Sequence, residues 1–288
     1  MDDVFAAAER FVRAEARLLE QRLFDTLFHG APAGGVVDAL RGYQNEDGGF
    51  GHGLEPDKRC PASLPLDVEI ALQTLVAART TDPEMLRRAA GFLDSVAVDG
   101  AVSLAAPVIE AYPRAEHMTD WTYVPGLNPT AGLAALLYQL DVDHPWRDAA
   151  TRYCWRALEE NPPPDDAHAL LEVFAFLAHV PDRARADKLV ATVTERLLTT
   201  SMFHLDPETE GYGLTPLHFA PTADSHWRSL FTDAQLDGHL DHLLRAQQPD
   251  GGWALTWEPP GTASRLAWRG RVTVEALRTL ESYGRLRR

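Results

Sequence analysis

The sequence of 288 residues is poor in cysteine, in lysine and in positive charge overall. Its two cysteines, Cys60 and Cys154, are too few for a disulfide framework. Lysine occurs only as Lys58 and Lys188, so nearly all of the positive charge is arginine. Acidic residues number 42 against 27 basic ones. The resulting net charge of −15 argues against nucleic-acid or anionic-membrane partners, because both bind basic surfaces.

Long apolar runs are missing as well. No stretch approaches the ~18 uncharged apolar residues of a membrane span, so we expect no transmembrane helix. Residues 1–28 carry charged side chains throughout, Arg10 and Arg13 among them, which excludes an apolar signal peptide. We therefore expect a cytoplasmic location. The arginine- and alanine-rich composition is typical of a bacterial chain from a GC-rich genome.

Apolar residues recur at three- and four-residue spacings along most of the chain, the pattern of amphipathic helices. The ranges expected to be helical are 4–28, 34–43, 66–79, 83–97, 130–140, 146–159, 166–179, 182–200, 233–247 and 271–285. Convincing alternation of apolar and polar residues, which would indicate strands, is absent. The predicted fold class is all-α.

Proline- and glycine-rich segments separate these helices. They cover 47–65, 99–128, 161–165, 203–222 and 248–270, and four exceed ~15 residues, a length that is usually functional or disordered. Their aromatic side chains argue against disorder, so we predict ordered loops gathered at one or both rims of a helical barrel. A helix expected at 223–231 is too short for a normal barrel wall and would open the cavity sideways.

The sharpest feature is an internal repeat. The string Leu-x-x-x-Gln-x-x-Asp-Gly-Gly, followed by an aromatic residue, occurs at 40–50 and again at 243–253. Glu-Pro follows the aspartate at the same distance in both copies, at 55–56 and 258–259. Weaker copies, such as Asp99-Gly100, fit a period of about 50 residues, the size of a helix pair with a long loop. Such units stack on their neighbours, and a series of them can close into a ring.

This string resembles the QW repeat of the prenyltransferase and squalene–hopene cyclase superfamily. The resemblance implies an α/α toroid, in which inner helices surround a central cavity and outer helices wrap them. We therefore expect one domain over 1–288, a barrel of about five or six helix hairpins, with an N-terminal helix in 1–30 and repeats over 34–285. In that superfamily the QW elements brace the ring, so Gln44 and Gln247 are interpreted as structural.

The catalytic motifs of the known branches are not found. Asp141-Val142-Asp143-His144 departs in its last residue from the Asp-x-Asp-Asp acid motif of class II terpene cyclases. Asp57-Lys58-Arg59-Cys60 has the wrong spacing for the zinc-binding Asp-x-Cys of protein prenyltransferases. We therefore expect neither a metal nor an organic cofactor.

Residues found in only one copy of the repeat are the better candidates for chemistry. The first loop and the helix after it combine carboxylates with an imidazole, a pairing that suits general acid–base catalysis. The loop at 203–226 adds histidines and another carboxylate. The alternatives are solvated loop charges, acids that favour a helix dipole, and hydrogen-bonded structural histidines. The predicted catalytic residues are His52, Glu55, Asp57, Asp67, Glu69, His218 and Asp224; Glu55 recurs as Glu258 in the last copy, so a structural role is its alternative.

Aromatic and arginine side chains are predicted to line the cavity. Aromatic faces stabilise carbocations, and arginine binds phosphate or carboxylate groups. Packing of loops onto the rim is the alternative role for the aromatic residues. The predicted ligand-binding residues are Arg59, Trp121, Tyr123, His226, Trp257, Trp268 and Arg269.

The leading hypothesis is an enzyme of bacterial secondary metabolism that resembles terpene cyclases. It would cyclise or isomerise a small, largely apolar substrate by acid–base chemistry; an isoprenoid skeleton and an anionic end are options. A carbohydrate-active helical barrel is the second hypothesis, because paired carboxylates and tryptophans suit sugars. The third is a non-catalytic toroid that binds a ligand or a protein. The oligomeric state stays open, with a homodimer as one option.

Overall fold

The computed structural model describes residues 4–200 and 202–286, which form helices joined by loops. The α-helices are α1 Val4–Glu15, α2 Leu18–His29, α3 Gly34–Arg41, α4 Pro65–Ala77, α5 Pro83–Val96, α6 Leu127–Gln139, α7 Pro145–Glu160, α8 Ala167–His179, α9 Arg183–Leu197, α10 Pro216–Phe219, α11 Asp233–Arg245 and α12 Thr262–Ser282. Short 3₁₀ turns are η1 Pro107–Ala111, η2 Glu116–Met118 and η3 Arg228–Leu230. These residues contain isolated β-bridges but no strand, so the predicted all-α class is confirmed.

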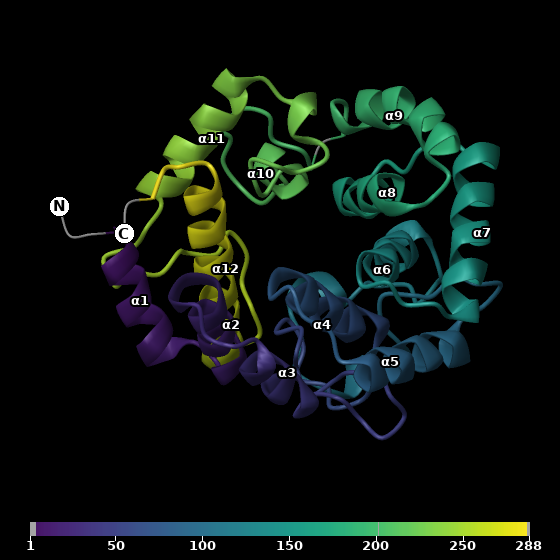
Figure 1. Ribbon diagram of the computed structural model, residues 1–288, viewed down its shortest axis with the longest axis horizontal. Helices are drawn as coiled ribbons and strands as arrows, with labels where there is room; N and C mark the ends of the chain where they lie inside the picture. Colours follow the sequence, from purple (N-terminus) through teal and green to yellow (C-terminus); the bar gives the residue numbers. More distant parts are fainter. Residues whose placement is uncertain (1–3, 201, 287–288) are drawn as a thin grey trace.

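The helices follow one another around a ring in the view of Figure 1. α4, α6, α8, α10 and α12 lie nearer its centre, and α3, α5, α7, α9 and α11 lie outside them. Among the inner helices, contacts run from α4 to α6, from α6 to α8 and from α8 to α10. α12 packs on α1 and α2, and α2 leads through α3 back to α4. The first helices therefore lie between the last repeat and the first one.

Inner and outer helices differ in which of their faces are apolar. α6 buries every residue from Pro129 to Leu137, as expected of a helix that is covered on all sides. α5 buries Met85, Ala89 and Phe92 at three- and four-residue spacings and exposes its opposite face. The inner helices thus form the shared core, and the outer helices cover it.

The first copy of the repeat forms a turn that attaches one unit to the next. The Gln44 side chain donates from Nε2 to the Gly48 carbonyl at 2.9 Å and to the Met85 carbonyl of α5 at 3.0 Å. Gly48 has a φ of +92°, and a Cβ there would lie 2.4 Å from the Arg88 carbonyl oxygen of α5. Only glycine fits both the backbone conformation and this close approach.

The last copy forms the same turn against α1. Gln247 Nε2 donates to the carbonyls of Gly251 and Val4, both at 2.9 Å. Gly251 has a φ of +95°, and a Cβ there would lie 2.1 Å from the Ala7 carbonyl oxygen. α1 therefore takes the place next to the last copy that α5 takes next to the first. The structural interpretation of the two glutamines is confirmed.

The aspartates of the repeat close the same two turns. Asp47 Oδ1 accepts from the Gly49 N–H at 3.0 Å, and Asp250 Oδ1 accepts from the Gly252 N–H at 3.1 Å. Asp250 also accepts two hydrogen bonds from Arg269, both at 2.7 Å, which hold the pKa of Asp250 below its ordinary value. The structure therefore corrects the prediction for Arg269, whose guanidinium is occupied by the scaffold.

A third glycine supports the weaker copy predicted at Asp99-Gly100. Gly100 has a φ of +86°, and a Cβ there would lie 2.6 Å from the Ala149 carbonyl oxygen of α7. Gly211, in the loop before α10, has a φ of +94°, but an added Cβ would meet nothing within 4 Å. The contact between a turn and the next outer helix is therefore lost at this loop.

Three predicted boundaries are corrected. The helix expected over 4–28 is two helices, because Arg17 leaves the helical conformation with a ψ of 160°. The last helix begins at Thr262 rather than 271, so Trp268 lies on a helix and not in a loop. The stretch 223–231 contains only the 3₁₀ turn η3; helix α10 starts earlier, at Pro216, because proline suits a first helical turn.

Candidate functional site

The loop between α3 and α4 is held by a lysine with no exposed surface. Lys58 Nζ lies 3.1 Å from Glu55 Oε2 and 2.8 Å from Asp67 Oδ2, and all three side chains are buried. Burial acts to lower the pKa of Lys58, but the two carboxylates raise it above its ordinary value, so the lysine stays charged. Burial raises the pKa of Asp67 to about 6. This ion-pair cluster fixes the loop to the first turn of α4.

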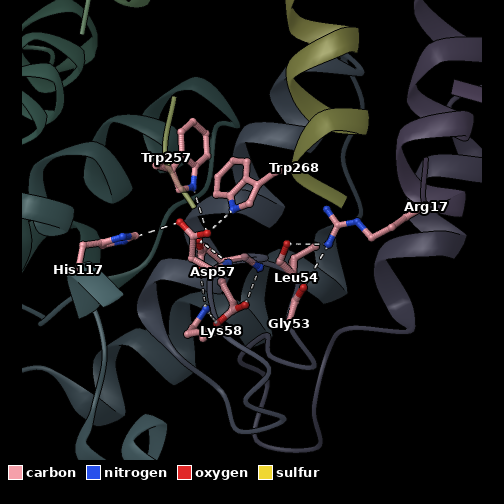
Figure 2. Close-up of polar contacts among 10 residues, drawn as sticks. Arg17, Gly53, Leu54, Asp57, Lys58, His117, Trp257 and Trp268 are labelled. Carbon is pink, nitrogen blue, oxygen red and sulfur yellow. Dashed lines mark hydrogen bonds and ion pairs between the residues drawn. The ribbon is translucent and has the colours of Figure 1, made fainter. Parts of the chain in front are cut away.

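Backbone groups of the same loop are fixed from two directions. Asp67 Oδ1 accepts from the Glu55 N–H at 2.9 Å. Arg17, at the break between α1 and α2, donates to the carbonyls of Gly53 and Leu54 at 3.1 and 2.9 Å (Figure 2). The carboxylates of Glu55 and Asp67, both predicted to be catalytic, therefore contact Lys58 and hold the loop in place.

Asp57 is the residue that this loop presents to the rest of the chain. Its Oδ1 accepts hydrogen bonds from the indole N–H groups of Trp257 at 3.1 Å and Trp268 at 2.8 Å. Its Oδ2 lies 3.7 Å from Nε2 of His117, on the turn η2 (Figure 2). Segments from the first loop, from η2 and from the last repeat thus meet at one carboxyl group.

The surroundings of Asp57 favour its protonated form. Its side chain is 7% exposed. Burial, together with the Glu55 carboxylate, raises the pKa of Asp57 to about 7, although the two indoles and Lys58 act in the opposite direction. Both indole N–H groups donate to Oδ1, so Oδ2 is the oxygen left to carry an acid proton. The protonated form of Asp57 is therefore populated near neutral pH, and Oδ2 is the oxygen that lies toward His117.

His117 is the solvent-facing partner of Asp57. Its side chain is 48% exposed. Desolvation lowers the pKa of His117 below its ordinary value, so the imidazole is mainly neutral at pH 7. Its ring lies 6.0 Å from that of Trp121, one of the predicted ligand-binding residues. An uncharged imidazole thus separates the buried carboxyl group from solvent.

Aromatic rings continue from Asp57 to the start of α8. Trp257 and Trp268 pack edge to face with centroids 5.2 Å apart, and Tyr212 packs in the same way on Trp257 at 5.7 Å. The Tyr212 hydroxyl lies 2.7 Å from Nε2 of His168, in the first turn of α8. Desolvation raises the pKa of Tyr212 to about 12, so its hydroxyl stays protonated. The site therefore combines an acid, indoles, a phenol and imidazoles.

His218 lies in the short helix α10. Desolvation by the surrounding protein lowers the pKa of His218 to about 4, so its imidazole is neutral at pH 7. His218 Nδ1 accepts from the Thr215 N–H at 2.9 Å and caps α10. This hydrogen bond matches the structural alternative for His218.

The predicted site residues divide into two groups. Asp57, Trp257 and Trp268 are in direct contact, and Trp121 lies beside His117. The second group lies outside this cluster, and its members have partners in their own loops. These pairs are His52 with Asn45 at 2.8 Å, Tyr123 with Glu110 at 2.9 Å, Asp224 with Thr222, and His226 with Trp227, whose ring centroids are 4.4 Å apart. Arg59 differs, because its backbone N–H donates to the Pro113 carbonyl of the loop between α5 and α6 at 2.9 Å.

A surface hollow of about 490 Å³ adjoins Trp257 and is lined by Arg265 and by Arg269, which was predicted to bind a ligand. Arg265 is paired with Glu258, and Arg269 is paired with the repeat aspartate. Both guanidinium groups are therefore committed to carboxylates of the chain, and the hollow has no free cation from these two residues.

Sequence reasoning missed His117, His168, Tyr212 and Glu172, and it gave Lys58 no role. Lys58 had a usable signal, because a chain that otherwise uses arginine has only two lysines. Glu172 is the one charged residue within 169–178, an apolar stretch of α8, and a lone charge on a buried helix marks a candidate site. His117 and Tyr212 had no local signal, because their partners lie in other repeats.

Comparison with known proteins gives no match: no family model fits the chain, and no curated protein resembles it at a significant level. None of the helices in residues 4–200 and 202–286 is long and apolar enough to span a membrane. The same residues contain no group of three or more His, Cys, Asp or Glu side chains placed to hold a metal ion. The assignment of a function therefore depends on the geometry around Asp57.

Proposed function

We propose that the chain is a single α/α toroid of the prenyltransferase and squalene–hopene cyclase type. Two features support this proposal. The helices follow a ring with alternating inner and outer members (Figure 1). The turns at Gln44 and Gln247 make the same contact with a neighbouring helix, α5 for Gln44 and α1 for Gln247.

We further propose that the protein is a cytoplasmic enzyme that acts on a small, largely apolar molecule by acid–base chemistry. The observation that carries this proposal is Asp57, an acid with one oxygen fixed by two indole N–H groups and the other free to give its proton. A carboxylic acid kept neutral near pH 7 among aromatic rings is suited to protonating a carbon–carbon double bond.

In the proposed reaction, the Oδ2 proton of Asp57 is transferred to one carbon of an isoprenoid double bond. The π electron pair forms the new C–H bond, positive charge develops at the other carbon, and Asp57 becomes a carboxylate. The indole N–H groups of Trp257 and Trp268 stabilise that carboxylate, and the aromatic faces stabilise the cation. Loss of a proton from the carbon next to the cation gives an isomerised alkene. In a cyclisation, the π electron pair of a second double bond first attacks the cationic carbon to form the ring C–C bond, and the proton is lost beside the new cationic carbon. His117 then returns a proton from solvent to Oδ2.

The test is turnover of geraniol, farnesol, geranylgeraniol, their diphosphates and squalene in deuterated water, with products identified by mass spectrometry. The wild type is expected to convert at least one of them into an isomer that carries one deuterium. Asp57→Asn removes the acid proton and is expected to lower turnover by about 10²–10⁴-fold. Asp224→Asn is the matched control, because Asp224 is an exposed aspartate outside the site.

Two results would contradict the proposal. One is turnover that Asp57→Asn leaves unchanged, which would show that another group supplies the proton. The other is the absence of any product from all of these isoprenoids. Binding without turnover would then favour a ligand-binding protein.

Carbohydrate processing is the second candidate function. It is favoured by the hydrogen-bonded pair of Tyr212 and His168, since these groups bind hydroxyls better than they bind a hydrocarbon. Release of sugar from aryl glycosides, lost in Asp57→Asn, would support this reading. The same result would replace the isoprenoid with a sugar as the proposed substrate.

A further inference from the structure

A second pair of acidic side chains meets between the inner helices α4 and α8. Glu69 and Glu172 are 4% and 9% exposed, and their carboxyl groups hydrogen-bond to each other. Such a bond needs a proton on one of the two groups. Burial raises the pKa of both carboxyls, so the pair keeps one proton at neutral pH, because a second ionisation would bring two negative charges together.

α6 leaves room for this contact. α6 packs against both α4 and α8. Gly132 lies on α6, and a Cβ at this position would lie 1.4 Å from Oε2 of Glu172. Any side chain at position 132 would therefore displace the carboxyl group. Three helices therefore form the site of the pair: α4 and α8 carry the two glutamates, and α6 leaves the space for them. Acidic side chains that meet on a surface need no such space.

The neighbours of the pair supply a hydrogen bond and a nearby positive charge: Arg271 acts electrostatically to lower the pKa of Glu69, although it also has an ion pair of its own. Gln73 Nε2 donates to Glu69 Oε1 at 3.1 Å, and Gln73 Oε1 accepts from Arg271 Nη2 at 2.8 Å. The ion pair of Arg271 is with Glu275. Among the residues that the structure describes, only Glu69 hydrogen-bonds to Glu172. The carboxyl pair therefore keeps the capacity to take up a second proton.

The pair and Asp57 are connected through a series of neighbouring side chains. His168 acts electrostatically on Glu69, and its Nε2 lies 2.7 Å from the Tyr212 hydroxyl. Tyr212 packs on Trp257, whose indole donates to Asp57. A ligand held against these rings would therefore have a proton donor on one side and a carboxyl pair with spare proton capacity on another.

We propose that the Glu69–Glu172 pair is the group that accepts the proton lost by the substrate, an inference that rests on the proposed function of Asp57. In this step the C–H bond next to the cationic carbon breaks, and its electron pair forms the product double bond. The proton passes to the ionised member of the pair. The pair as a whole then holds two protons and carries no charge. One proton returns from the pair to solvent, and one passes from solvent to Asp57, so no reagent is consumed.

The first test uses the isoprenoid turnover in deuterated water described above. Glu69→Gln and Glu172→Gln keep a hydrogen bond between the two positions but cannot take up the second proton. The alkene product is expected to fall at least ~10²-fold, and an alcohol from capture of the cation by water is expected in its place. Glu208→Gln is the matched control, because Glu208 is exposed and pairs with Arg245. Unchanged alkene yield in both pair variants would overturn the inference.

The second test needs no substrate. N,N-dimethyldodecylamine, protonated at pH 7, places a positive charge on an alkyl chain as the carbocation does. Calorimetric titration in buffers of different ionisation enthalpy counts the protons released when it binds. The wild type is expected to release more protons than Glu172→Gln, because a cation beside the pair expels the shared proton. The same difference in proton release is expected when both proteins also carry Asp57→Asn.

The two tests separate the two proposals. An unchanged proton count in Glu172→Gln, or failure of the amine to bind, overturns the role of the pair. Absence of turnover with every isoprenoid, together with the expected proton count, counts against the proposed reaction of Asp57 instead.

Discussion

The first and last copies of the repeat share a turn but differ around their common glutamate. In the first copy Glu55 is buried with Lys58, whereas in the last copy Glu258 is exposed with Arg265. The residue before Glu258 is Trp257, and its indole reaches across to Asp57 in the first copy. The contacts that both copies share build the scaffold. The candidate catalytic residues lie where the two copies differ from each other and are in contact.

The largest effect is expected from Lys58→Met. The substitution leaves Glu55 and Asp67 buried without their cation, and the free energy of unfolding is expected to fall by about 3–5 kcal/mol. Arg265→Met, the matched change in the last copy, should cost less than about 1 kcal/mol because its ion pair is exposed. Urea unfolding measures both. Equal losses would show that the two glutamates do not differ in the way described.

Gly48→Ala and Gly251→Ala test what the copies have in common. Each places a methyl group at a positive φ and against a carbonyl of the next helix, at 2.4 Å and 2.1 Å. A similar loss of roughly 2–4 kcal/mol is expected from both. Gly211→Ala is the control: it has the same sign of φ but no close neighbour, and should cost about 1 kcal/mol. Thermal or urea unfolding that ranks Gly211→Ala with the other two would contradict this account.

Asp57→Asn is expected to stabilise the protein at alkaline pH. The pKa of Asp57 is about 7 in the folded protein, against an ordinary value of 3.8. The folded protein binds more protons between these values, so wild-type stability falls as pH rises from about 4 to about 7 and stays level above it. The asparagine still accepts the indole hydrogens but never ionises. A gain of about 1–2 kcal/mol is expected at pH 8 and almost none at pH 4.

Thermal unfolding at the two pH values measures this difference. A gain that is the same at pH 4 and pH 8 would mean that it does not come from ionisation of Asp57.

The smallest effect is expected from removing one of the indole hydrogen bonds that join the last copy of the repeat to Asp57 in the first copy. Trp268→Phe removes the N–H that donates to Asp57 at 2.8 Å, and Trp257→Phe removes the one at 3.1 Å. Either change should raise the pKa of Asp57 by roughly 0.5–1, because the carboxylate loses a donor that favours it. Carbon-13 NMR titration of the aspartate carboxyls measures the pKa. Trp121→Phe, with no hydrogen bond to Asp57, should leave it unchanged.

Features that depend on neighbours in sequence could be predicted. The helical spacing, the glycines of the turns and the structural glutamines follow from local patterns, and all are seen in the structure. The boundary at Arg17 could not be predicted, because its guanidinium contacts Gly53 and Leu54 from another repeat. Local sequence patterns therefore predict the structure within each repeat well and the contacts between repeats poorly.

The candidate site was predicted in part. Asp57 stood among several charged residues of its loop, and only folding distinguishes it, by placing two distant tryptophans at its Oδ1. His52 was equally attractive by type and spacing, yet it lies beside Asn45 on the outside. Glu69 was singled out, but its partner Glu172 lies on a different helix. Acid–base roles depend on desolvation and on partners, which a single sequence does not display.

The contact between the last repeat and α1 has a consequence for the order of folding. Most helices that pack together are close to each other in the sequence. Gln247, in contrast, hydrogen-bonds to Val4, near the other end of the sequence. Contacts at such separation carry a large loop-closure cost and form late. During synthesis, the cluster that contains Phe11 and Val12 of α1 can first pack only against α2, since it is completed by α11 and α12. α1 is thus made long before its cluster is complete, and it is where we expect a chaperone to bind the growing chain.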